Sequence, residues 1–106
     1  MAWTFLLLAG LLEIGWAVGL KFSDGLSFAR PLATLLTVAA MAASVVLLGL
    51  AARHLPIGTA YAIWVGIGAA GTAIAGMMLF DEPATAARIG AIAVIVAGVA
   101  GLKLVS

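Results

Sequence analysis

Glu13 is the residue whose chemistry most needs an explanation, because it is the only ionisable side chain in the apolar run from Met1 to Leu20. An acidic side chain near the middle of a bilayer costs about 2.5–3.5 kcal/mol even on a permissive insertion scale. A residue with that cost is expected to serve a function. The function that suits a carboxylate inside a membrane is to bind a proton or a mobile cation.

Two neighbours of Glu13 are spaced so that they would border the carboxylate. Gly10, Glu13 and Trp16 are three residues apart, which places them on one face of a helix. Glu13 would then have open space on one side, next to Gly10, and an aromatic ring on the other. This arrangement is typical of a site for a small organic cation.

A second pair of aromatic residues, Tyr61 and Trp64, has the same spacing further along the chain. Aromatic rings hold cations by cation–π attraction, and a hydroxyl such as that of Ser44 orients hydrogen-bond donors. Tryptophan in membrane proteins commonly anchors a helix at the lipid–water interface, which is the role expected for Trp3. Trp16 and Trp64 lie deeper in their segments, and this depth favours a binding role for both.

The elements that position these residues are predicted from the composition. Hydrophobic residues make up 66% of the chain and charged residues 8%, whereas soluble domains carry about 25% charged residues. A bilayer core about 30 Å thick is crossed by about 20 helical residues. We therefore expect an all-α, multi-pass membrane protein whose single four-helix transmembrane domain covers residues 1–106. The four spans are predicted at approximately residues 2–21, 31–52, 57–80 and 85–104.

The first apolar segment could instead be a cleaved signal peptide. It has no basic region ahead of the apolar run, and a buried Glu is unusual in a signal peptide. We therefore expect this segment to remain as a membrane span.

The residues that are absent narrow the possible chemistry. The chain has no Cys, and its one His, His54, lies in a loop without metal-ligand spacing to another ligand. We expect no metal site, no cofactor, no nucleic-acid partner and no enzymatic activity. The remaining chemistry is that of binding and releasing an ion.

Glycine is dense in the third span, where Gly66 and Gly68 flank Ile67. Glycine weakens a helix locally, so these residues are a candidate hinge about which the span rearranges. They would equally allow another helix to pack closely. The sequence leaves these two interpretations open.

The fourth span carries a candidate contact face for a second subunit. Gly90, Val94 and Gly98 recur at every fourth residue, and small residues let helices approach closely in lipid. The alternative is packing within the subunit. Four short helices fill their own interior, so a transport pathway is expected to form between two copies.

Basic residues are nearly balanced between the two ends of the predicted bundle. With four spans, Arg53 and Lys103 share one side of the membrane, and Lys21, Arg30 and Arg88 share the other. The positive-inside rule then gives no firm direction, so the chain is expected to insert in both orientations.

Three stretches of the sequence resemble the small multidrug resistance transporters over essentially the whole chain. They are EIGWAVGLKFSDG at residues 13–25, LPIGTAYAIWVGIGA at residues 55–69, and Gly101-Leu102-Lys103. Within that family, Trp16 and the stretch GTAYAIW are similar to the guanidinium exporter subtype rather than to the broad multidrug subtype.

The resemblance implies a proton-coupled exporter that works as an antiparallel, dual-topology homodimer in the bacterial inner membrane. It implies that Glu13 of each subunit binds substrate and protons in turn. It places Trp16, Tyr61 and Trp64 in the substrate pocket, and Gly66 to Gly68 at a kink of the third helix.

The position of Ser44 depends on how the loop before the second span is aligned. This chain has about two extra loop residues before Arg30 compared with the family, and surface loops tolerate such insertions. Aligned on Arg30, Ser44 falls on the pocket serine of the family, whereas alignment on Pro31 displaces it.

The leading hypothesis is proton-driven export of guanidinium or a small guanidinyl cation. Two alternatives remain: a polyspecific exporter of quaternary ammonium or aromatic cations, and a non-transporting membrane subunit that stabilises a partner. In the last case Glu13 would pair with a basic residue in the membrane span of another chain.

Overall fold

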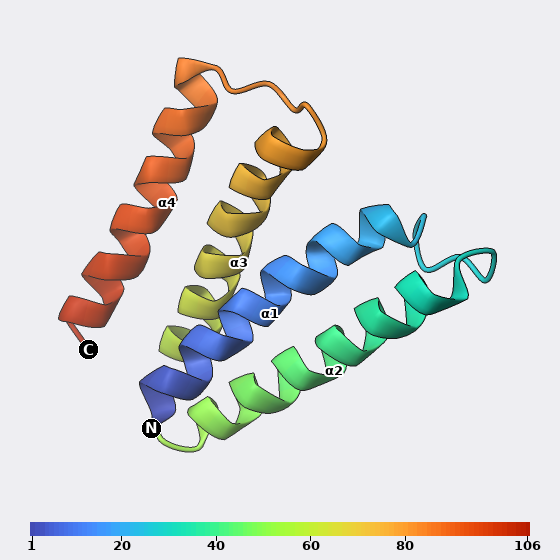
Figure 1. The fold of residues 1–106 in the computed structure, drawn as a ribbon. Coiled ribbons are helices and arrows are strands. Elements are labelled where there is room, and N and C mark those ends of the chain that lie inside the picture. Colours follow the sequence, from blue (N-terminus) through green and yellow to red (C-terminus); the bar gives the residue numbers. More distant parts are fainter.

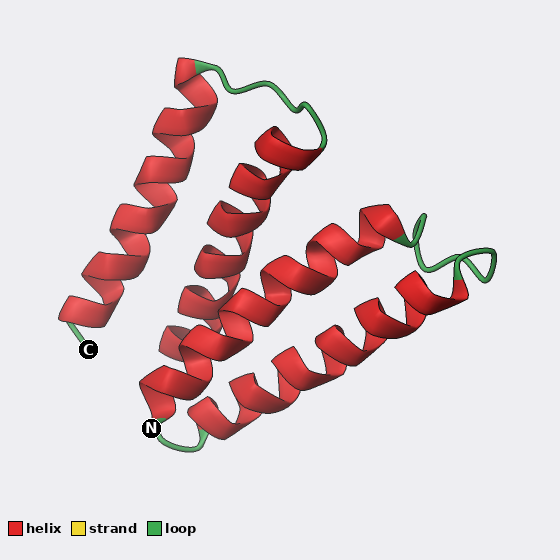
Figure 2. Cartoon of the chain, viewed as in Figure 1, coloured by secondary structure: helices red, strands yellow, loops and turns green.

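The computed structural model describes residues 1–106 and consists of four α-helices joined by short loops (Figures 1 and 2). Their bounds are α1 Ala2–Phe22, α2 Pro31–Ala52, α3 Ile57–Leu79 and α4 Ala86–Leu104. All four helices are long and apolar enough to cross a membrane. The predicted all-α, four-helix class is therefore confirmed.

The helices begin and end where the sequence provides local signals. Pro31 opens α2 at a position where its missing N–H costs no hydrogen bond. Thr85 caps α4, because its hydroxyl accepts a hydrogen bond from the backbone N–H of Arg88 at 3.2 Å. Between α1 and α2 the chain turns through consecutive residues with positive φ, from Asp24 to Leu26.

The helices form two antiparallel pairs that cross each other at an angle, α1 with α2 and α3 with α4 (Figure 1). α1 is the central element, since it packs against both α2 and α3, whereas α4 packs mainly against α3. The buried core lies near the end of the molecule that holds both chain termini. It comprises six residues from α1, α2 and α3: Leu6, Ala9, Leu48, Ala51, Ala60 and Ile63.

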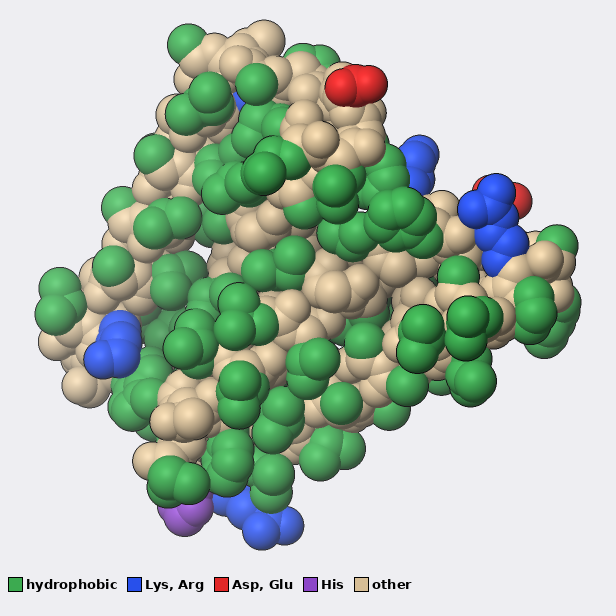
Figure 3. All heavy atoms as spheres, viewed as in Figure 1, with side chains coloured by type: hydrophobic (Ala, Val, Ile, Leu, Met, Phe, Trp, Pro, Cys, Tyr) green, Lys and Arg blue, Asp and Glu red, His purple; other side chains and the backbone are tan.

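One subunit has a small interior. Only 13 of its 106 residues are buried, and apolar side chains cover the visible face of the molecule (Figure 3). A surface of this kind suits a chain surrounded by lipid or by another subunit.

Candidate functional site

Glu13 lies in the middle of α1, and its carboxyl group rests directly on the backbone of α3 at Gly68. A Cβ atom placed on Gly68 would overlap Oε1 and Cδ of Glu13 and would lie 2.7 Å from its Cγ. Gly68 itself is buried. The absence of a side chain at Gly68 is therefore what allows the carboxyl group to sit between the two helices.

The Glu13 carboxyl group has no partner in the subunit that would balance a negative charge. Its Oε2 atom is shielded from solvent and accepts no hydrogen bond. The only salt bridge joins Arg88 to Glu82 at the surface, over 3.3 Å. Since a buried polar atom without a hydrogen bond costs about 1–3 kcal/mol, this oxygen is free to bind a proton or a cationic ligand.

Two further polar atoms of α1 and α3 are buried without partners, namely Nε1 of Trp16 and Oγ1 of Thr72. Trp16 follows Glu13 by three residues on the same face of α1, as the sequence predicts. Thr72 was not among the predicted site residues. It follows Gly68 by four residues and so lies one turn further along the same face of α3. The sequence feature that could have identified Thr72 is a single hydroxyl, four residues after Gly68, in an otherwise apolar stretch of α3.

Ser44 and Trp64 form a hydrogen-bond network one turn before Glu13. The buried hydroxyl of Ser44 donates to the carbonyl of Ala9 at 2.6 Å, and Nε1 of Trp64 donates to Ser44 Oγ at 3.0 Å and to the same carbonyl at 3.2 Å. In an α-helix, the Ala9 carbonyl accepts the bond from the backbone N–H of Glu13. The network therefore ties α2 and α3 to the turn of α1 that carries Glu13, although neither side chain bonds to the carboxyl group itself.

Tyr61 extends this aromatic group towards the surface. Its ring centroid lies 5.6 Å from that of Trp64 with an interplanar angle of 51°, a tilted geometry favourable for aromatic pairs. The side chain is 54% exposed. Within one subunit Tyr61 is therefore placed next to Trp64 and at the surface, and its role as a pocket residue stays a prediction.

The open space expected beside Gly10 is not present in the subunit. A Cβ atom on Gly10 would lie 2.7 Å from Cγ2 and 2.9 Å from Cβ of Ile67. The side chain of Ile67 from α3 fills the space, because the missing side chain at Gly10 lets α3 approach α1 closely. The expectation of a void was wrong, while the role of Gly10 in lining a pocket of the assembled protein stays a prediction.

The candidate hinge glycines both lie at close contacts between helices. A Cβ on Gly66 would overlap Cγ2 of Val99 in α4, just as a Cβ on Gly68 would overlap Glu13. α3 runs without interruption from Ile57 to Leu79. Close packing therefore accounts for both glycines in this structure, and the hinge stays a prediction.

The candidate contact face of α4 touches no other helix of the subunit. Val94 is 71% exposed, and a Cβ on Gly90 or Gly98 would meet nothing within 4 Å. Packing within the subunit does not explain this row of residues. Its contact with a second subunit stays a prediction.

No three His, Cys, Asp or Glu side chains lie together in a way that could hold a metal ion. The groups available at the site are the carboxyl group of Glu13 and, three residues further along α1, the indole of Trp16. The hydroxyl of Thr72 lines a separate hollow with Ala17, Val18 and Lys21. The site at Glu13 can exchange hydrogen-bonding cations with protons, and this requires no covalent step.

Comparison with known proteins finds one matching family and several similar proteins that share one name. Residues 1–95 match the family model described as Small Multidrug Resistance protein. A protein of Yersinia pseudotuberculosis named guanidinium exporter is 56% identical over 106 residues, which covers 100% of both chains. Proteins of the same name from Salmonella typhimurium strain LT2 and Citrobacter freundii are 53% and 52% identical over 104 residues, covering 98% of this chain and 97% of theirs. The resemblance seen in the sequence is thus confirmed, and the chain belongs to the small multidrug resistance family.

Proposed function

We propose that this protein exports guanidinium or small guanidinyl cations in exchange for protons, with Glu13 binding either ion. Three relatives that match it along nearly their whole length carry the name guanidinium exporter. The structural observation that carries the proposal is the unpartnered, solvent-shielded oxygen of Glu13 in a membrane-spanning helix. A carboxylate without a basic partner in its own chain needs a cation from outside.

Guanidinium fits this carboxylate better than a quaternary ammonium ion does. The planar cation presents parallel N–H donors that match both oxygens of a carboxylate. A quaternary ammonium ion has no N–H donor, so it would leave those oxygens without hydrogen bonds.

Coupling to protons follows from competition for one group. A protonated Glu13 carries no charge and does not hold a cation, and a Glu13 occupied by a cation excludes the proton. Exchange then requires only that the site open alternately to the two sides of the membrane. Protons entering from the acidic side release the cation there, and cation arriving on the other side displaces protons.

The working unit in this proposal is an antiparallel homodimer in the bacterial inner membrane. The near balance of basic residues, with Arg53 and Lys103 at one end and Lys21, Arg30 and Arg88 at the other, supports insertion in both orientations. The bare row of small residues on α4 supports a contact between two copies.

The proposal is tested by transport in liposomes that contain only the purified protein. With a pH gradient imposed, the wild type is expected to accumulate guanidinium, and Glu13→Gln is expected to abolish accumulation. Glu82→Gln is the matched control, because Glu82 is also acidic but lies at the surface in an ion pair with Arg88.

Three results would contradict the proposal. Guanidinium transport by Glu13→Gln at the wild-type rate would remove the carboxylate from the mechanism. Transport of quaternary ammonium ions without transport of guanidinium would favour the multidrug alternative. Failure of the wild type to move either ion would favour a non-transporting subunit.

A further inference from the structure

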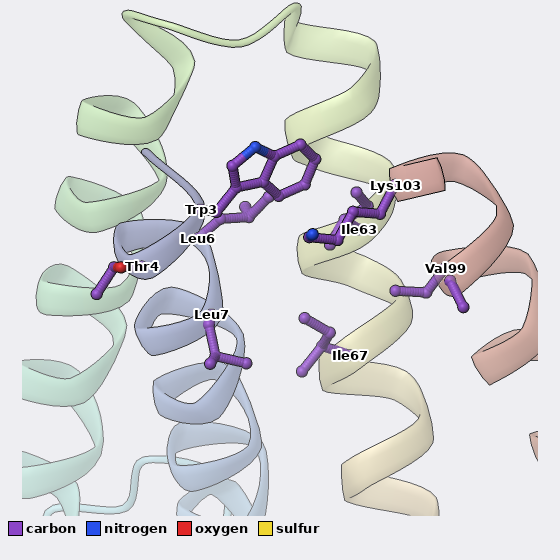
Figure 4. Close-up of a pocket in the computed structure, with 9 residues that line it drawn as sticks. Trp3, Thr4, Leu6, Leu7, Ile63, Ile67, Val99 and Lys103 are labelled. Carbon is purple, nitrogen blue, oxygen red and sulfur yellow. The ribbon is translucent and has the colours of Figure 1, made fainter. Parts of the chain in front are cut away.

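Figure 4 shows a crevice between α1, α3 and α4. Glu13 is not among its lining residues, most of which lie near the start of α1 and the end of α4, where both termini are. The volume of the crevice is about 300 Å³, which is at the lower end of the range for ligand pockets. Apolar side chains from three helices form its walls, and Figure 4 shows those of Leu7, Ile67 and Val99 directed into the gap. Ala100 completes the wall on α4. The lining therefore suits a hydrocarbon chain.

The mouth of the crevice carries a positive charge beside an aromatic ring. Nζ of Lys103 lies 5.0 Å from the centroid of the Trp3 ring, within the range of a cation–π contact. Lys103 forms no salt bridge. Trp3 is in the first turn of α1 and Lys103 in the last turn of α4, so both lie where a helix meets the headgroup region.

The side chains that carry charge at this end of the molecule are basic. The side chains of Arg53, His54 and Lys103 lie here, and no acidic side chain does. Asp24, Asp81 and Glu82 all lie in loops at the opposite end, and Figure 3 shows acidic side chains only there. A crevice with apolar walls, an unpaired lysine at its mouth and no acidic side chain nearby is complementary to an amphiphile with an anionic head.

We propose that this crevice binds an anionic phospholipid of the surrounding bilayer. Lys103 pairs with the phosphate group while the Trp3 ring lies against the headgroup region, and part of one acyl chain lies between α1, α3 and α4. Basic pockets between membrane helices recognise lipid headgroups by this chemistry. The site is separate from the carboxylate of the transport proposal and does not depend on it.

Native mass spectrometry of the detergent-solubilised protein tests the proposal, with phosphatidylglycerol and phosphatidylcholine of identical acyl chains as probes. The wild type is expected to retain phosphatidylglycerol preferentially. Lys103→Gln is expected to lower this preference about fivefold, the value of one basic residue near an anionic headgroup. Lys103→Arg keeps the charge and should keep the preference. Arg53→Gln is the matched control, since Arg53 lies at the same end but outside the crevice.

A second variant tests the walls without a change in charge. Ala100→Phe fills the crevice and is expected to reduce retention of both lipids. Equal losses of preference in Lys103→Gln and Arg53→Gln would overturn the proposal in favour of general surface attraction. Unchanged lipid retention in Ala100→Phe would also overturn it. If that variant instead weakened self-association, a second copy of the chain would be the occupant.

Discussion

Most glycines of α1 and α3 and all glycines of α4 lie in opposite surroundings, with Gly15 and Gly58 as the open exceptions in the first group. In α1 and α3, a Cβ placed on Gly10, Gly66, Gly68 or Gly71 would collide with a side chain from another helix of the same subunit. In α4, a Cβ on Gly90, Gly98 or Gly101 would meet nothing within 4 Å. The same residue type therefore closes contacts inside the subunit in one region and leaves a bare surface in the other.

This contrast separates the candidate site from the proposed contact surface on α4. α1, α2 and α3 share the buried core and carry Glu13, Ser44 and Trp64. α4 has no buried residue and packs mainly on α3. Because lipid provides no hydrophobic force between helices, a row of small residues gains stability only by packing against another helix. The bare row on α4 is thus the surface to which the proposed second copy would bind.

Among the crowded glycines, Gly68 is the position where we expect an added methyl group to reduce transport most. Gly68→Ala places a methyl group where the Glu13 carboxyl group lies, and overpacking of this kind costs about 1–3 kcal/mol. We expect guanidinium transport to fall about tenfold or more, while the helix content measured by circular dichroism is retained. Gly58→Ala makes the same change at an open position of α3 and should transport normally. Equal activity of the two variants would show that the contact with Glu13 is unimportant.

A substitution at Gly98 tests whether the open face of α4 forms the contact between two subunits. A Cβ on Gly98 meets nothing of its own subunit within 4 Å, so Gly98→Leu should leave the fold of the monomer intact. Gly98→Leu should weaken dimerisation about tenfold, because overpacking a tight contact between two subunits costs about 1–3 kcal/mol. Cross-linking in detergent over a range of protein concentrations measures the effect. Gly49→Leu, at an equally open glycine of α2, is the control. A dimer unaffected by Gly98→Leu would place the interface elsewhere.

Gly66 distinguishes a hinge from a packing contact at the junction of α3 and α4. Gly66→Ala should lower the free energy of unfolding by about 1 kcal/mol, because the added methyl group meets Val99. If packing is the reason for this glycine, Val99→Ala in the same chain should restore both stability and transport. A double variant that is stable but does not transport would instead support the hinge. Thermal unfolding and liposome transport provide the two measurements.

The Ser44–Trp64 network should have the smallest effect. Ser44→Ala removes the hydroxyl but leaves the Trp64 N–H its bond to the Ala9 carbonyl. The expected loss of stability is about 0.6 kcal/mol, the average for hydrogen bonds between membrane helices. Because both side chains share one carbonyl, the effects of Ser44→Ala and Trp64→Phe should not add. Additive effects in thermal unfolding would show that the two bonds are independent.

The four helices and the special position of Glu13 could be predicted from the sequence. Long apolar runs interrupted by charges and prolines determine where a chain crosses a bilayer, and an acid inside such a run is conspicuous. The shared face of Glu13 and Trp16 follows from helical spacing alone.

The contacts between helices could not be predicted from the sequence as well as the helices themselves. Whether Gly10 borders a void or the side chain of Ile67 depends on the rotation of α3 about its axis, which a nearly uniform apolar helix does not encode. The bond of Ser44 to Ala9 depends on a carbonyl, which no side-chain pattern reveals. Thr72 was missed because its importance comes only from its distance along α3 from Gly68.

The central claim is that guanidinium and protons compete for Glu13. Isothermal titration calorimetry of guanidinium binding to the purified protein, repeated across a range of pH, tests it most directly. Competition for Glu13 predicts that affinity falls as pH falls, because the proton then occupies the carboxylate, and that binding at intermediate pH releases protons to the buffer. Glu13→Gln should show no such binding. Wild-type affinity that does not change with pH, with no proton release, would contradict the account.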